Sequence, residues 1–61
     1  MRWVIRVSEP YESMYYEYCG SEQEVLEYLN RRHLLDPEDV VIEPEALVSY
    51  SPSEFKERYV N

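Results

Sequence analysis

The chain has 61 residues, of which 13 are acidic and 6 are Lys or Arg, so its formal net charge is −7. A chain of this length forms one small domain and buries only about 60% of the surface that it exposes when unfolded. Its negative charge disfavours direct contact with nucleic acid or an anionic membrane surface. No apolar run approaches the ~20 residues of a membrane span, and the start lacks a signal-peptide core. We expect a single domain, residues 1–61, in the cytoplasm.

The cysteine content limits how this small domain is stabilised. Cys19 is the only cysteine, so an internal disulfide is excluded, and no Cys/His cluster offers zinc ligands. One free thiol is typical of a cytoplasmic protein. Small chains without a disulfide or a metal often gain stability from a second subunit, so we expect a homodimer.

The first residues predict a β-hairpin. Apolar and polar residues alternate from Arg2 to Ser8, which is typical of a half-buried strand. Pro10 favours a turn, and Ser13 to Cys19 is a second strand. We expect one face of the hairpin to be apolar and to be built from Trp3, Ile5, Val7, Met14, Tyr16 and Tyr18. The opposite face would then carry Arg2, Val4, Arg6, Tyr15, Glu17 and Cys19.

The next stretch predicts an amphipathic helix after the turn at Gly20. Ser21 and Glu24 have the spacing of a capping box, in which each side chain satisfies a free backbone N–H. Acids in the first turn and Arg31 and Arg32 in the last turn suit the helix dipole. The stripe that would pack on the hairpin consists of Val25, Leu26, Leu29 and then His33 or Leu34. Tyr28 would lie on the polar side.

The remainder predicts one or two further strands. Residues 36–39 form a turn, and Val40–Glu43 is a β-branched strand that Pro44 ends or marks as an edge. Residues 47–50 either continue this strand after a bulge or form a fourth one.

A second capping box, Ser51 with Glu54, starts a short helix that runs to about Tyr59. The order is β-β-α-β(-β)-α. It indicates an α+β fold with a three- or four-stranded antiparallel sheet, one main helix across a face and a short C-terminal helix.

No stretch carries a catalytic signature. His33 stands alone near a helix end, Cys19 has no relay partner in the sequence, and the serines fall at turns and caps without a GxSxG elbow. Asp36, Glu38 and Asp39 lack the glycine and the spacing of an EF-hand. We expect a protein that is not an enzyme and that holds no cofactor and no metal.

The charges are segregated along the chain. Six acids and no base lie between Arg6 and Arg31, and six more lie between Arg32 and Lys56 without Lys or Arg. Glutamates three apart on a helix, or two apart in a strand, have spacings comparable to those of phosphates along DNA. Such a surface either binds a basic partner or only keeps a small protein soluble.

The seven tyrosines support an interface, because tyrosine supplies rigid, half-polar contact area. Tyr28 is the sharpest candidate for a binding hot spot, and Tyr15 would lie on the sheet face opposite the helix. The predicted partner-binding set is Tyr15, Glu17, Glu24, Glu27, Tyr28, Glu43 and Glu45.

The segment from Tyr15 to Ile42 resembles the very short phage-encoded inhibitors of uracil-DNA glycosylase. The resemblance consists of Tyr15-Tyr16-Glu17-Tyr18, then Glu24-Val25-Leu26 with Tyr28 soon after, then a β-branched strand. It implies an acidic dimer that mimics DNA. The chain departs from that pattern at Gln23, where an aromatic residue would be expected, and in its C-terminal helix.

Together these features predict a small inhibitor that binds a basic nucleic-acid-processing enzyme, such as a glycosylase, nuclease, CRISPR effector or polymerase. If it is encoded by a phage, it would act in the host cytoplasm. The alternative is a structural, assembly or antitoxin-like module that acts through dimerisation.

Overall fold

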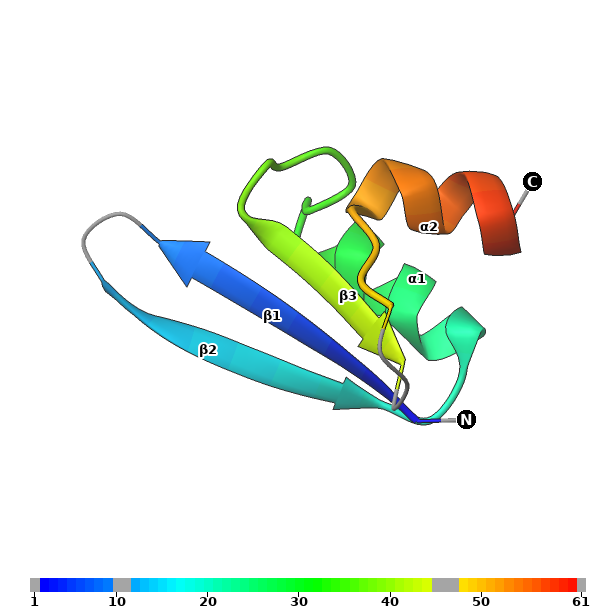
Figure 1. Ribbon diagram of the computed structural model, residues 1–61, viewed down its shortest axis with the longest axis horizontal. Helices are drawn as coiled ribbons and strands as arrows, with labels where there is room; N and C mark the ends of the chain where they lie inside the picture. The colour runs from blue at the N-terminus through cyan, green and yellow to red at the C-terminus, as the bar shows by residue number, and fades with distance from the viewer. Residues whose placement is uncertain (1, 10–11, 45–47, 61) are drawn as a thin grey trace.

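The computed structural model describes residues 2–9, 12–44 and 48–60. It confirms the predicted α+β class and the order of the elements (Figure 1). The elements are β1 (Trp3–Glu9), β2 (Glu12–Cys19), α1 (Glu22–Arg31), β3 (Val40–Pro44) and α2 (Pro52–Tyr59). In the part of the chain that is described, neither helix has the length and apolarity to cross a membrane.

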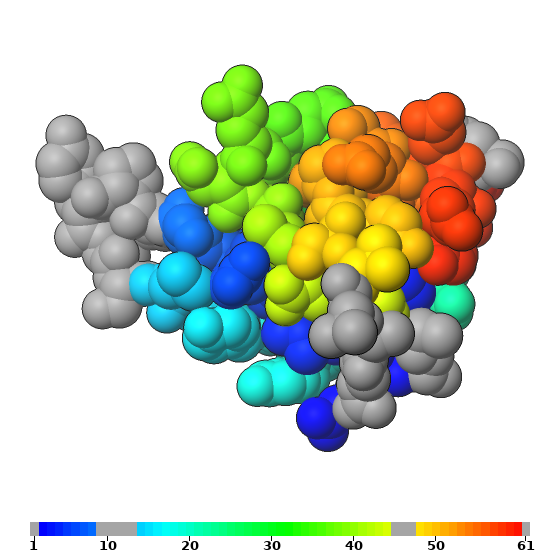
Figure 2. All heavy atoms as spheres, viewed as in Figure 1, coloured from blue at the N-terminus to red at the C-terminus, as the bar shows by residue number. Residues whose placement is uncertain are grey.

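The sheet has three strands in the order β2-β1-β3, and both pairs are antiparallel. Side chains from both helices join the inward side chains of β1 and β3 in one core, so the helices cover the same face of the sheet (Figure 1). β2 is an edge strand and forms the lower left margin of the molecule in Figure 2. The opposite sheet face has no helix on it in the described part of the chain.

The expected fourth strand is reduced to a single bridge. Ile42 donates its N–H to the Tyr50 carbonyl at 2.7 Å and accepts from the Tyr50 N–H at 2.8 Å. Leu47 lies outside the described residues. Pro44 does end β3, as predicted, and residue 50 covers the outer edge of that strand.

The predicted facing of the second strand is wrong. The register pairs Trp3 with Cys19 and Val7 with Tyr15, so Tyr15, Glu17 and Cys19 share the helix-covered face. The other side chains of β2 point away from the core: Met14, Tyr16 and Tyr18 are 46%, 52% and 59% exposed. Both faces of this strand carry apolar residues, so its hydrophobic pattern does not select one of them. The strand register, which shifts between Val7 and Glu9, decides which face of β2 turns toward the helices.

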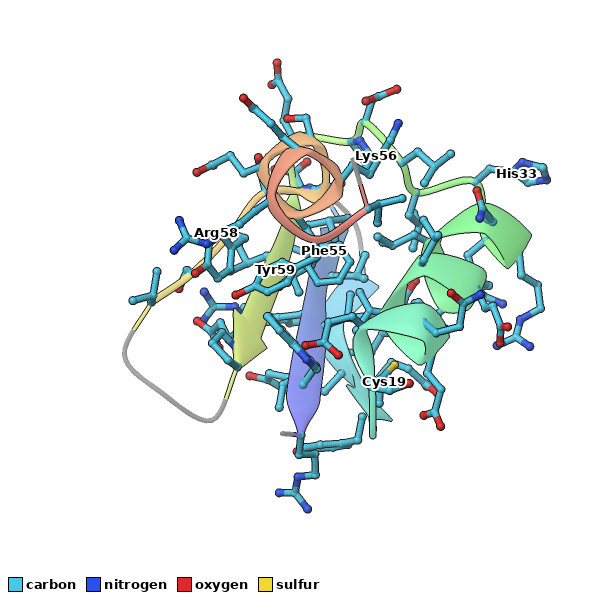
Figure 3. The ribbon with its side chains drawn as sticks, turned by 90° about the vertical axis from the view of Figure 1, so that its right-hand side faces the viewer. Cys19, His33, Phe55, Lys56, Arg58 and Tyr59 are labelled. Atoms are coloured by element: carbon cyan, nitrogen blue, oxygen red, sulfur yellow. The ribbon has the colours of Figure 1, made fainter. Side chains whose placement is uncertain are left out.

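The centre of the core is an aromatic cluster around Trp3, which is fully buried. Its ring lies edge-on to Phe55 and to Tyr59, with centroids 5.2 and 5.1 Å apart, and 6.1 Å from that of Tyr50. Figure 3 shows Phe55 and Tyr59 projecting from α2 toward the sheet. Edge-to-face aromatic pairs contribute about 0.5–1.5 kcal/mol beyond the area they bury, so this cluster fixes α2 on β1.

Both helices begin at the predicted caps. At α2 the capping box is complete: Ser51 Oγ accepts from the Glu54 N–H at 3.2 Å, and Glu54 Oε1 accepts from the Ser51 N–H at 3.3 Å. At α1, Ser21 Oγ accepts from the Glu24 N–H at 3.2 Å, but the Glu24 carboxylate accepts from Gly20 instead of Ser21. The first turn of α1 is therefore tied to the end of β2.

The end of α1 is a Schellman motif. The N–H of Leu34 donates to the Leu29 carbonyl at 2.8 Å, and the N–H of His33 donates to the Asn30 carbonyl at 3.2 Å. His33 has φ 56°, the left-handed conformation that glycine usually supplies. It is exposed and points outward in Figure 3, whereas Leu34 is half-buried and continues the apolar stripe.

We expect His33→Gly to stabilise the fold by about 1 kcal/mol, because glycine adopts the left-handed conformation without the Cβ clash. Thermal unfolding should show a midpoint higher by roughly 4–8 °C. His33→Ala is the control, since alanine keeps the clash and should give no such gain. Equal gains from both substitutions would contradict this account of the helix end.

Candidate functional site

The predicted partner-binding residues do not form one surface. Glu45 lies outside the described residues, and the other members of the set are divided among the helix-covered face of the sheet, its open face and α1. The burial and the partners of each residue therefore decide whether a partner protein can contact it.

Tyr28 is part of the core, so its predicted place on the polar side of the helix is wrong. Its side chain is 7% exposed, and burial, followed by the neighbouring Tyr15, raises its pKa. The Tyr15 and Tyr28 hydroxyls also raise the pKa of the Arg32 guanidinium beside them. Tyr15, Tyr28 and Arg32 therefore form a cluster that joins β2 to the end of α1.

Glu17 and Glu43, the strand carboxylates of the set that the structure describes, are both only partly exposed. Glu17 is half-buried on the helix-covered face, not on the opposite face as predicted. Glu43 lies on the open face, where its Oε1 is 3.5 Å from the Arg6 guanidinium and accepts from Ser49 Oγ at 3.0 Å. An ion pair of this kind leaves little charge for a partner to recognise.

The acids of α1 remain on the surface. Glu24 and Glu27 are both exposed, although Glu24 Oε2 accepts from the Gly20 N–H at 2.8 Å and Glu27 Oε1 from Gln23 at 3.3 Å. Glu22 adds a third carboxylate at the start of the helix, and α1 carries no base before Arg31. This first half of α1 is a compact region of uncompensated negative charge.

A groove lies beside these acids, between the start of α1 and the end of α2. It has a volume of about 200 Å³, and we call it the inter-helix groove. Its lining residues are Glu22, Gln23, Leu26, Tyr59 and Val60. The two helix ends meet at the right of Figure 2, where the blue-green start of α1 lies next to the red end of α2. The groove thus combines apolar side chains with a carboxylate at its rim.

Tyr59 is the most constrained residue of the groove. Its ring packs against Trp3, Phe55 and Tyr50 with centroids 5.1, 5.2 and 5.8 Å apart, yet the side chain is 39% exposed. A hydrogen bond with Tyr59, followed by burial, raises the pKa of Tyr50. A rigid, half-exposed aromatic ring of this kind is typical of an interface anchor.

Sequence reasoning missed the inter-helix groove. The sequence placed Tyr59 at the end of the C-terminal helix, but its exposure and its proximity to Leu26 depend on how the helices pack. The one available signal was the pair of capping boxes, which locates both helix starts but not their contact.

No protein-family model, curated protein or solved structure matches this chain. Residues 2–9, 12–44 and 48–60 contain no group of three or more His, Cys, Asp or Glu side chains arranged to hold a metal ion. The resemblance to the glycosylase inhibitors therefore stays a prediction.

We expect stability to fall as the pH rises above about 8.5, the ordinary pKa of a cysteine thiol. Burial, followed by Glu17 and Glu24, raises the pKa of Cys19, which lies beneath α1 (Figure 3). The folded chain then keeps a proton that the unfolded chain loses, so this contribution is complete below the unfolded pKa and is lost as the pH rises through the folded one.

Urea denaturation at a series of pH values measures this effect. Cys19→Ala removes the titrating group, so its unfolding free energy should fall less steeply than that of the natural chain just above pH 8.5. The two chains have the same tyrosines, so tyrosine ionisation should affect both alike. Parallel curves for the two proteins would rule out the thiol as the cause.

Proposed function

We propose that this protein is a small acidic inhibitor that binds the basic surface of a nucleic-acid-processing enzyme and blocks it without catalysis of its own. The observation that supports this proposal is the arrangement at the start of α1. Three carboxylates there have no base within the helix before Arg31, and one of them, Glu22, lines the inter-helix groove. Carboxylates would replace phosphates, and the groove would supply the apolar contact.

The charge of the whole chain favours such a partner. A net charge of −7 on 61 residues produces a field that attracts basic surfaces and accelerates their encounter with the protein. The cleft in which an enzyme holds nucleic acid is basic for the same electrostatic reason. Occupation of that cleft by this chain would exclude DNA sterically.

The helix presents its acids in a preorganised way. Ser21 and Glu24 hold its first turn, while Val25 and Leu29 are fully buried beneath it. Glu24 and Glu27 are one helical turn apart, with Cβ atoms roughly 5–6 Å from each other. Because this spacing exists before binding, little conformational entropy is lost when a partner is bound.

The inter-helix groove adds an apolar anchor to the acidic surface. Leu26, Tyr59 and Val60 offer a hollow that a protruding apolar side chain of the target would fill. Interface energy is usually concentrated in such aromatic-lined hollows, surrounded by polar residues that exclude water. The resemblance to phage-encoded inhibitors makes uracil-DNA glycosylase the first target to test, and a phage origin would place the protein in the host cytoplasm.

A second candidate function is that of a structural, assembly or antitoxin-like module. The uncovered sheet face favours it, because Met14, Tyr16 and Tyr18 are exposed together there. A module of this kind would bind a dedicated protein partner through that face, and its function would not depend on the acids of α1.

We expect the chain to displace labelled duplex DNA from purified uracil-DNA glycosylase, measured by fluorescence anisotropy, with weaker displacement as salt is raised. Neutralising two acids of α1, Glu22→Gln at the groove together with Glu27→Gln, should weaken displacement about fivefold to tenfold. This magnitude corresponds to about 0.5–0.7 kcal/mol for each of the two exposed ion pairs that are lost.

The matched control is Glu38→Gln with Asp39→Asn, which removes the same charge from an exposed loop away from the groove. It should leave displacement nearly unchanged. The same assay on a nuclease, a CRISPR effector and a polymerase extends the test to the other target classes. Failure to displace DNA from any of them would exclude the inhibitor function and favour the assembly module.

A further inference from the structure

The outer edge of β2 is free of backbone partners among the described residues. β1 pairs with β2 on one side and β3 on the other, and Tyr50 covers the outer side of β3. No described segment pairs with the outer side of β2, which is eight residues long and lies at the margin of the sheet in Figure 1. β2 also lacks the lysine or proline that commonly protects an exposed edge.

Alternation of backbone groups shows which residues face this free edge. Ile42 directs its N–H and C=O outward to Tyr50, so its neighbours on β3 direct theirs toward β1. Ser8 fits this alternation, because its N–H points toward the β3 side and donates to the Asp39 carbonyl at 3.0 Å. On β1, the residues that bond to β2 are therefore Trp3, Ile5 and Val7, whose partners are Cys19, Glu17 and Tyr15.

The residues between these partners direct their backbone groups away from the sheet. They are Met14, Tyr16 and Tyr18, whose side chains are also the exposed ones on the open face. At each of these three residues, the N–H and C=O have no partner among the described residues and the side chain is exposed. An extended strand that pairs here would gain hydrogen bonds and side-chain contacts at the same residues.

We propose that two copies of this chain pair antiparallel through the outer edges of β2, about a twofold axis at Tyr16, and form one continuous six-stranded sheet. Tyr16 would exchange both backbone hydrogen bonds with Tyr16 of the second copy, and Met14 would pair with Tyr18. In this register Met14, Tyr16 and Tyr18 of each strand all form hydrogen bonds with the second copy. The pairing is argued from the strand edge and rests on neither proposed function, although it involves Glu24 of α1 and the exposed side chains of the open face.

The charges on the helix-covered side fit this register. It places Glu17 opposite Tyr15 of the second copy, next to the Arg32 guanidinium that lies beside Tyr15. A register shifted so that the axis falls on Glu17 would bring two carboxylates together, which is unfavourable. Charge complementarity therefore favours the axis at Tyr16.

The α1 helices are self-complementary about the same axis. α1 runs antiparallel to β2, since Glu24 lies near Cys19 at one end and Arg32 near Tyr15 at the other. The twofold rotation brings the acidic start of one helix toward the basic end of the other. Glu24 and Arg31 are seven residues apart, close to two helical turns, so they lie on the same side of α1, and the pairing would bring each toward the other in the second copy.

Sedimentation velocity of the full chain over a range of concentrations tests the dimer, and cysteine cross-linking tests its register. In a Cys19→Ala background, Tyr16→Cys should oxidise to a disulfide-linked dimer, because paired residues have Cα atoms about 5.5 Å apart, within disulfide range. Val48→Cys is the matched control, since Val48 is 51% exposed and Tyr16 52%, but Val48 lies away from the edge. It should remain largely monomeric on a non-reducing gel.

Tyr16→Pro removes an outward N–H that the monomer does not use, and it should shift the chain to monomer while circular dichroism shows a retained fold. Arg31→Glu should weaken the dimer, and adding Glu24→Lys should restore it. Glu27→Lys, which lies elsewhere on α1, should not. A monomer at every concentration, a dimer indifferent to Tyr16→Pro, or faster cross-linking through Tyr15→Cys than through Tyr16→Cys would overturn the proposal.

Discussion

The burial of Trp3 against α2 is the interaction on which the rest of this structure depends. Trp3 is fully buried at the start of the central strand, and its ring contacts Phe55 and Tyr59 on α2 and Tyr50 before it. Without that contact, α2 would lose its main attachment to the sheet, and the inter-helix groove would lose Tyr59. The Trp3 indole N–H has no hydrogen-bond partner among the described residues, so the cluster is stabilised by ring packing and burial.

The small size of the chain explains why its surfaces differ so strongly. Two helices are enough to cover one face of a three-stranded sheet, and the described residues place no element on the other face or along the outer edge of β2. Three acids lie on the first half of α1, whereas the open face carries Arg6 in an ion pair with Glu43 beside exposed tyrosines. The proposed acidic surface of α1 and the proposed pairing edge of β2 lie on different elements, and Glu24 is the acid that the two proposals share.

Local patterns predicted most of the fold. Three of these patterns rest on interactions within a few residues, and all are confirmed. They are the caps at Ser21 and Ser51, the alternation from Trp3 to Val7 and the end of β3 at Pro44. The candidate site was much less predictable. Tyr28 was placed on the polar side because the stripe was drawn through Leu26. The buried side of α1 is instead centred on Val25 and Leu29 and includes Tyr28. The outward turn of Tyr16 and Tyr18 depends on a hairpin register that the composition of β2 leaves ambiguous.

The sequence by itself determined the class of fold, the two helix starts, the negative charge and the lack of an internal disulfide, because each follows from composition or from contacts along a short stretch. Only the tertiary structure decided which tyrosines are anchors and which are core. The segment from Glu12 to Arg31 supplies both β2 and α1, yet its exposed residues are those that the hairpin register and the docking of α2 leave uncovered. Those two features join residues far apart in the chain, so local pattern does not specify them.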